Sequence, residues 1–131
     1  MPIWTFLEFL NADGTSEFGR WMHSNAVTHA ARARIYAEIR IIRTLAELKR
    51  PEVGMLKGEC KGLLELRIKV NNVQYRPLCY RGPGPREITI LIGAVEKGGE
   101  FDPKNACETA FNRIELIKKH GRGRLRELQY E

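Results

Sequence analysis

The stretch that decides the fold is GLLELRIKVNNVQYRPLCYR, residues 62–81. Its first half alternates apolar and polar side chains, and this period of two is typical of a strand that buries one face. The apolar positions are Leu64, Leu66, Ile68 and Val70. Asn71-Asn72 interrupts the alternation, and asparagine tolerates the positive φ angles of a two-residue hairpin turn. We therefore expect two antiparallel strands, over residues 62–70 and 73–81.

Further strands are predicted on both sides of this hairpin. Residues 2–10 are dense in aromatic and branched side chains and end at a turn sequence, Asn11-Ala12-Asp13-Gly14. Residues 88–95 are almost all apolar, which is typical of a central strand covered on both faces.

Capping residues and apolar spacing predict three helices. Ser16 is positioned to cap a short helix that ends near Met22, and Ser24 or Asn25 to cap a long one that Pro51 ends. A third helix is expected from Asp102 to Gly121, with Pro103 at its first position. The resulting class is α+β: an antiparallel β-meander sheet with helices packed on one face. We assign residues 1–120 to one domain and residues 121–131 to a basic, flexible tail.

Composition restricts where the chain works. It has 131 residues, a net charge of +6 and no apolar run long enough for a membrane span. Its apolar first ten residues lack the basic region of a secretory signal. The three cysteines, Cys60, Cys79 and Cys107, are odd in number and form no CxxC pair, which favours reduced thiols. We expect a cytoplasmic protein that does not contact membranes.

The basic residues are concentrated in two segments. Residues 20–50 hold seven basic residues against two acidic ones, and residues 113–126 hold six against one. Such segments suit an anionic partner such as nucleic acid, although solvated helix faces explain them equally well.

The hairpin register adds a more local indication. It places Arg67 opposite Arg76, with Lys69 on the same face, and like charges across a ladder are destabilising. A shared anion such as phosphate would remove the conflict, because a guanidinium fork suits phosphate. The alternatives are a register shifted by one residue, or long side chains that spread into water. We expect no paired carboxylates on this face.

The sequence has no HExxH, GxSxG or Walker motif and its histidines are isolated, so we predict no metal and no cofactor.

Several segments in order carry a resemblance to a known family: LKG at 56–58, GLLELRI at 62–68, QYRPLCY at 74–80, an apolar strand that ends at Lys97, and FDP at 101–103. This order resembles the RelE/HigB toxin superfamily, within it the phage-derived HigB-like branch. The resemblance implies a RelE-like toxin fold and the toxin of a type II toxin-antitoxin system. Its activity would be that of an mRNA interferase, a metal-independent endoribonuclease and hydrolase that cleaves mRNA on the ribosome. Its cognate antitoxin would be a helix-turn-helix protein.

The resemblance also implies roles for individual residues. Arg67 and Lys69 match basic residues that line the RNA cleft, Arg76 matches the arginine that holds the scissile phosphate, and Lys97 matches a basic segment after the last strand. In such a site the substrate 2′-OH attacks, Lys69 accepts its proton, Arg76 neutralises the phosphoryl oxygens and Lys97 stabilises the leaving oxygen. Further RNA or phosphate contacts are assigned to five basic residues: Lys57, Lys61, Arg122, Arg124 and Arg126. The alternative is a non-catalytic relative that binds nucleic acid or an antitoxin.

Overall fold

The computed structural model, which describes residues 1–130, confirms the hairpin and its register. Strands β4 (Ile68–Val70) and β5 (Val73–Tyr75) are antiparallel, with Val70 opposite Val73 and Lys69 opposite Gln74. Asn71 and Asn72 take φ values of 50° and 66°, the conformation that a two-residue turn of this kind requires. The turn residues therefore fix the strand pairing, as the sequence predicts.

The alternating run over residues 62–70 is nevertheless not one strand. It breaks at Arg67, so that β3 (Leu64–Leu66) and β4 belong to different sheets. The strand expected over residues 73–81 breaks in the same way at Arg76-Pro77, so that only its first part, β5, pairs with β4. A six-stranded sheet has the order β10-β1-β7-β6-β3-β2, and a four-stranded sheet the order β4-β5-β8-β9. The remaining strands are β1 (Thr5–Phe9), β2 (Val53–Met55), β6 (Leu78–Arg81), β7 (Glu87–Ile92), β8 (Val95–Lys97), β9 (Glu100–Asp102) and β10 (Leu125–Glu127).

The predicted α+β class is confirmed, and the simple meander is wrong. The chain's first strand, β1, pairs in parallel with β7 and in antiparallel fashion with β10, so the large sheet is mixed. Strand β7 lies between β1 and β6, the central position that its apolar sequence predicts.

The three helices begin and end close to the predicted signals, with exceptions. Helix α1 (Glu17–Met22) is capped by Ser16, whose hydroxyl accepts from Gly19 N at 3.0 Å. Helix α2 (His29–Ile42) is capped by Thr28 instead of Ser24 or Asn25, and it ends well before Pro51. Helix α3 (Ala106–His120) stops at Gly121 as predicted but begins after Asn105, because Glu100–Asp102 form β9. No helix within residues 1–130 is long and apolar enough to cross a membrane.

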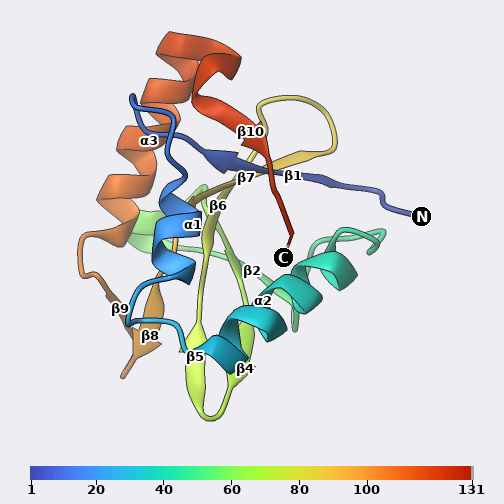
Figure 1. Ribbon diagram of the computed structural model, residues 1–131, viewed down its shortest axis with the longest axis vertical. Helices are drawn as coiled ribbons and strands as arrows, with labels where there is room; N and C mark the ends of the chain where they lie inside the picture. The colour runs from blue at the N-terminus through green and yellow to red at the C-terminus, as the bar shows by residue number, and fades with distance from the viewer. Residues whose placement is uncertain (131) are drawn as a thin grey trace.

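Helices cover both faces of the large sheet, not one face as expected (Figure 1). Side chains of α1 and α2 share a core with Ile88 and Ile90 of β7, whereas α3 packs with Leu91 of the same strand. Because successive side chains of a strand point to opposite faces, these two cores lie on opposite sides of the sheet.

The predicted flexible tail forms part of the sheet over its described residues. Residues Gly121–Arg124 make a 3-10 turn, η2, and β10 then pairs with β1, with Glu127 opposite Leu7 and Leu125 opposite Phe9. Leu128 is buried and donates its N–H to the Phe6 carbonyl at 2.9 Å. The domain therefore extends beyond residue 120.

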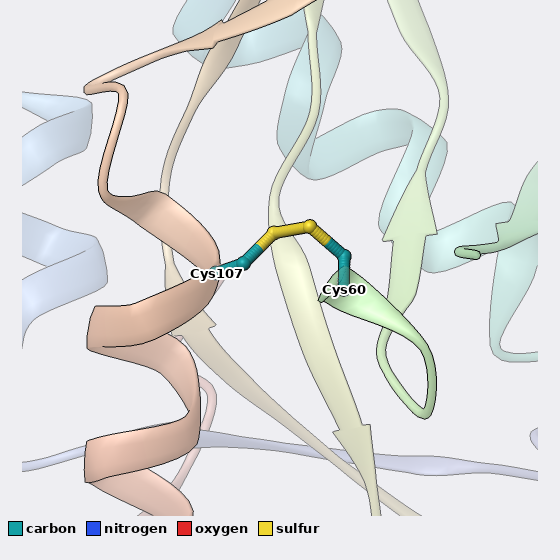
Figure 2. Close-up of a disulfide and its surroundings, with 2 residues drawn as sticks. All are labelled: Cys60 and Cys107. Carbon is teal, nitrogen blue, oxygen red and sulfur yellow. A yellow bond between two sulfur atoms is a disulfide. The ribbon is translucent and has the colours of Figure 1, made fainter. Parts of the chain in front are cut away.

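The expectation of reduced thiols is also corrected. Cys60 and Cys107 form a disulfide that joins the 3-10 turn η1 (Gly58–Cys60) to the first turn of α3 (Figure 2). Cys79 is free and buried in the core, and burial raises the pKa of its thiol, which leaves it unreactive.

The disulfide predicts a measurable contribution to stability. Its cysteines are 47 residues apart, and a cross-link that closes a loop of this length stabilises a domain by up to about 4 kcal/mol through the unfolded chain. The double variant Cys60→Ser, Cys107→Ser should lose about 2–4 kcal/mol in urea unfolding. Adding reductant should have the same effect on wild type and none on the variant, and a reductant-insensitive wild type would contradict the assignment.

Candidate nucleic-acid interface

Two arginines of the predicted site, Arg67 and Arg76, lie where the chain crosses from one sheet to the other. Arg67 stands between β3 and β4, and Arg76 follows β5 just before β6. Backbone hydrogen bonds fix both crossings: Arg67 N donates to the Glu52 carbonyl at 2.9 Å, and Arg76 N to the Ala94 carbonyl at 2.8 Å. The hairpin register thus brings the two guanidinium groups together, as the sequence predicts.

A carboxylate already occupies the position between them. Arg67 Nη1 lies 2.6 Å from Glu65 Oε2, and Arg76 Nε lies 3.5 Å from Glu65 Oε1. Gly54 on the neighbouring strand makes room for this group, since a Cβ at position 54 would stand 2.7 Å from Glu65 Oε2. The anion that the paired arginines require is therefore supplied by the protein itself.

Arg76 is almost completely buried, with a side chain that is 4% exposed. Its Nη2 donates to Gln74 Oε1 at 2.6 Å and its Nη1 to the Tyr75 carbonyl at 3.2 Å. Burial and the neighbouring charge of Arg67 lower the pKa of this guanidinium below its usual value, although an arginine of this kind stays charged. Its Nε makes no hydrogen bond, because the closest carboxylate oxygens are 3.5 Å away.

Glu96 is the second of these carboxylates, and sequence reasoning missed it. It lies on β8 opposite Gln74, which in turn lies opposite Lys69, so one row across the small sheet carries all three side chains. Glu96 is 33% exposed and can therefore contact a ligand, unlike Glu65, which is 5% exposed. The expectation that this face holds no paired carboxylates is wrong. The periodicity of residues 62–70 already placed Glu65 beside Arg67, but nothing local indicated that Glu96 would pair with β5.

The two predicted catalytic lysines are placed differently. Lys69 is exposed and belongs to the row of Gln74 and Glu96. Lys97 follows Glu96 on β8 and therefore points to the opposite face, where its ammonium lies 3.4 Å from Asp102. The structure brings together Arg67, Arg76 and Lys69, and it does not bring Lys97 to them.

The predicted RNA-binding arginines of the C-terminal segment have partners within the protein. Arg122 holds Glu87 through two contacts of 2.6 and 3.1 Å, and Arg126 pairs with the buried Glu8 across the β1–β10 ladder. Arg124 donates to the Leu10 carbonyl and packs over the ring of Phe9. These side chains attach the C-terminal segment to the sheet.

Lys57 and Lys61 are exposed and flank η1. Together with Arg81 they line an apolar cavity of about 480 Å³ beside the edge strand β2. The predicted phosphate contacts are thus split between this cavity and the C-terminal segment, and neither group includes Arg67 or Arg76.

Comparisons with protein-family models, with curated proteins and with solved structures return no match for this chain. Across residues 1–130, no three His, Cys, Asp or Glu side chains are grouped so that they could hold a metal ion.

The buried position of Glu65 predicts a strong effect on stability. Glu65→Gln leaves Arg76 buried with less compensating charge and should cost about 3–5 kcal/mol in chemical unfolding. Glu96→Gln, at the more exposed carboxylate beside the same arginine, should cost less than about 1 kcal/mol. Equal losses in the two variants would show that burial does not distinguish these carboxylates.

The Arg122–Glu87 pair predicts a pH dependence. The hydrogen bond from Arg122 holds the pKa of Glu87 below its usual value of 4.5. A carboxyl group whose pKa is depressed on folding stabilises the fold above its unfolded pKa, and this contribution is lost as the pH falls through the folded value. Arg122→Gln should therefore be less stable than wild type at pH 7, and the difference should shrink below pH 4.5 in unfolding titrations. Lys119→Gln removes an equal charge from an exposed site on α3 and should show no such convergence.

Proposed function

We propose that this protein is a ribosome-dependent mRNA endoribonuclease that acts as the toxin of a type II toxin-antitoxin system. The observation that carries the proposal is the convergence of Arg67 and Arg76 on one anionic group, next to a partly exposed row of polar side chains. The resemblance of residues 56–103 to RelE/HigB toxins supplies the reaction class, and the convergence of the arginines supports it.

In this proposal an RNA phosphate competes with the Glu65 carboxylate for the arginines. Arg67 is 25% exposed, so its guanidinium can reach a ligand while Arg76 stays in place below it. A phosphate held there would have its developing negative charge neutralised by donors already in position, which is the main electrostatic source of rate acceleration in such sites.

Removal of the nucleophile's proton is assigned to Glu96, and Lys69 is assigned a binding role. The reaction needs a group that removes the proton of the substrate 2′-OH, and a carboxylate accepts protons at neutral pH more readily than an ammonium group does. Glu96 lies in contact distance of Arg76 and is open to solvent. We therefore assign it the role of general base, a change from the sequence prediction, and we keep Lys69 as the cation that orients the RNA backbone. As the 2′-oxygen bonds to phosphorus, the bond from phosphorus to the 5′-oxygen breaks, and the 5′-oxygen takes its proton from water.

The dependence on the ribosome follows from the shape of the site. The polar row is partly exposed on a small sheet and Arg76 is buried, so the site alone cannot hold a flexible RNA in line for attack. Positioning of this kind accounts for several kcal/mol of a barrier. The decoding site, which holds the codon, is proposed to supply it.

A second candidate is a nucleic-acid-binding or antitoxin-binding protein without catalysis. It is favoured by the burial of Arg76 and by its two carboxylate neighbours, which together satisfy its charge without a ligand. The two candidates differ in whether RNA is cut, and they share the expectation that it is bound.

Primer extension after induced expression distinguishes them. Wild type should cut translated messages in codon register, and purified protein should cut mRNA only when ribosomes are present. Glu96→Gln should reduce cutting at least ~100-fold, the usual contribution of a general base, and Lys119→Gln should leave it unchanged. Both substitutions lie on exposed or half-exposed positions, so circular dichroism and melting should match wild type.

Three outcomes would count against the proposal. Efficient cleavage of RNA without ribosomes would remove the positioning argument, and unchanged cutting by Glu96→Gln would remove the assigned base. RNA binding without any cutting in either assay would favour the second candidate. Arg76→Ala alone does not decide the matter, because the loss of a buried charge also lowers stability.

A further inference from the structure

The cavity beside β2 is built for a different ligand from the arginine cluster. It has a volume of about 480 Å³, which lies in the usual range for small-molecule sites. Its walls are aliphatic and come from the segment after α2 and from β2, β3 and their connections: Leu48, Met55, Leu56, Leu63 and Leu64. No aromatic side chain lines it, so it offers no stacking surface for a nucleobase.

Water reaches part of this apolar surface. Met55 is 71% exposed, and among the described residues the only other large apolar side chains with such exposure are Met1 and Ile41. Met55 lies on β2, the edge strand of the six-stranded sheet, and no strand within residues 1–130 pairs with the outer side of β2. Apolar surface that is exposed next to a recess is typical of a binding site.

The rim of the cavity carries charge of one sign. Lys57, Lys61 and Arg81 line it, and no acidic side chain among residues 1–130 does. The guanidinium of Arg81 lies 5.0 Å from the ring centre of Trp4, a cation–π contact that restricts this side chain without neutralising its charge. Other basic residues of the fold, such as Arg67 and Arg122, are paired with carboxylates.

We propose that the cavity binds a small amphiphile with one anionic head group on an aliphatic chain, such as a medium-chain carboxylate. The chain fills the aliphatic recess, and the head group lies among Lys57, Lys61 and Arg81. This site is independent of the proposed nuclease, since it shares no residue with the Arg67–Arg76 cluster. It reassigns Lys57 and Lys61 from RNA binding to the recognition of the head group.

Calorimetric titration of the full chain with hexanoate, octanoate, decanoate and dodecanoate, each below its aggregation concentration, tests the site. Each methylene that enters the recess should tighten binding about fourfold, the equivalent of about 0.8 kcal/mol, until the recess is full. Decanol and decyltrimethylammonium carry the same chain with other head groups. Their affinities should be at least about fivefold lower than that of decanoate.

Matched variants test the two halves of the site separately. Met55→Glu places a carboxylate on the apolar wall and should weaken decanoate binding about tenfold or more. Ile41→Glu makes the same change at an exposed apolar residue of α2 and should have no effect. Lys57→Gln with Lys61→Gln should weaken decanoate and leave decanol unchanged, whereas Lys118→Gln with Lys119→Gln on α3 should change neither. All of these side chains are exposed, so their replacement leaves the core intact.

Each of the following results would overturn the proposal: no binding of any carboxylate at millimolar concentration, affinity that does not rise with chain length, equal affinity for decanol and decanoate, or equal effects of Met55→Glu and Ile41→Glu. Binding only to phosphatidylglycerol vesicles would assign the surface to a membrane, and displacement of decanoate by a single-stranded RNA oligonucleotide would assign it to nucleic acid.

Discussion

The contact on which much of the structure depends is the buried carboxylate of Glu65. Glu65 belongs to the six-stranded sheet, and the arginines it faces lie at the two points where the chain passes into or out of the four-stranded sheet. A charge that is 5% exposed is tolerated only when opposite charges and hydrogen bonds surround it. The two sheets cannot separate or shift in register without leaving Glu65 or Arg76 unpaired, so this cluster specifies how they meet. Gly54 is required for this cluster, because a larger residue at position 54 would displace the Glu65 carboxylate.

The cluster of Glu65 with the two arginines also determines how the proposed site would bind a ligand. The guanidinium groups are held in place by the fold before any ligand arrives, which is the condition under which electrostatic stabilisation of a transition state costs least. The same carboxylate competes with the ligand, so a phosphate must bring enough additional contacts to replace it. Lys69 and Glu96, in the partly exposed row next to the cluster, are in a position to supply them. An internal competitor of this kind favours a substrate that is already held by something larger, as a codon is on the ribosome.

The sequence predicted the hairpin because every signal there is local. The period of two, the Asn71-Asn72 turn and the meeting of Arg67 with Arg76 all follow from neighbouring residues. The sequence predictions are wrong where contacts between segments far apart in the chain determine the structure. A period of two indicates which side chains share a face but not whether that face is buried, so it does not predict that Glu65 is a buried partner of the two arginines. Asp102-Pro103 has the features of a helix start, yet pairing with β8 draws Glu100–Asp102 into β9. The partner of Cys60, and the pairing of β10 with β1, likewise depend on contacts that no spacing reveals.

The disulfide connects these long-range contacts to the second binding surface. Cys60 lies between Lys57 and Lys61, the two lysines that line the aliphatic cavity. The turn η1 that carries Cys60 buries none of its side chains and is only three residues long, so packing alone holds it weakly. The covalent bond to Cys107 attaches η1 to α3, whose own position is set by the core it shares with Leu78 and Leu91. The positions of Lys57 and Lys61 at the cavity therefore depend on the packing of α3 against the large sheet. The cross-link thus fixes a surface turn that contacts the hydrophobic core only through partly buried side chains, Cys60 among them.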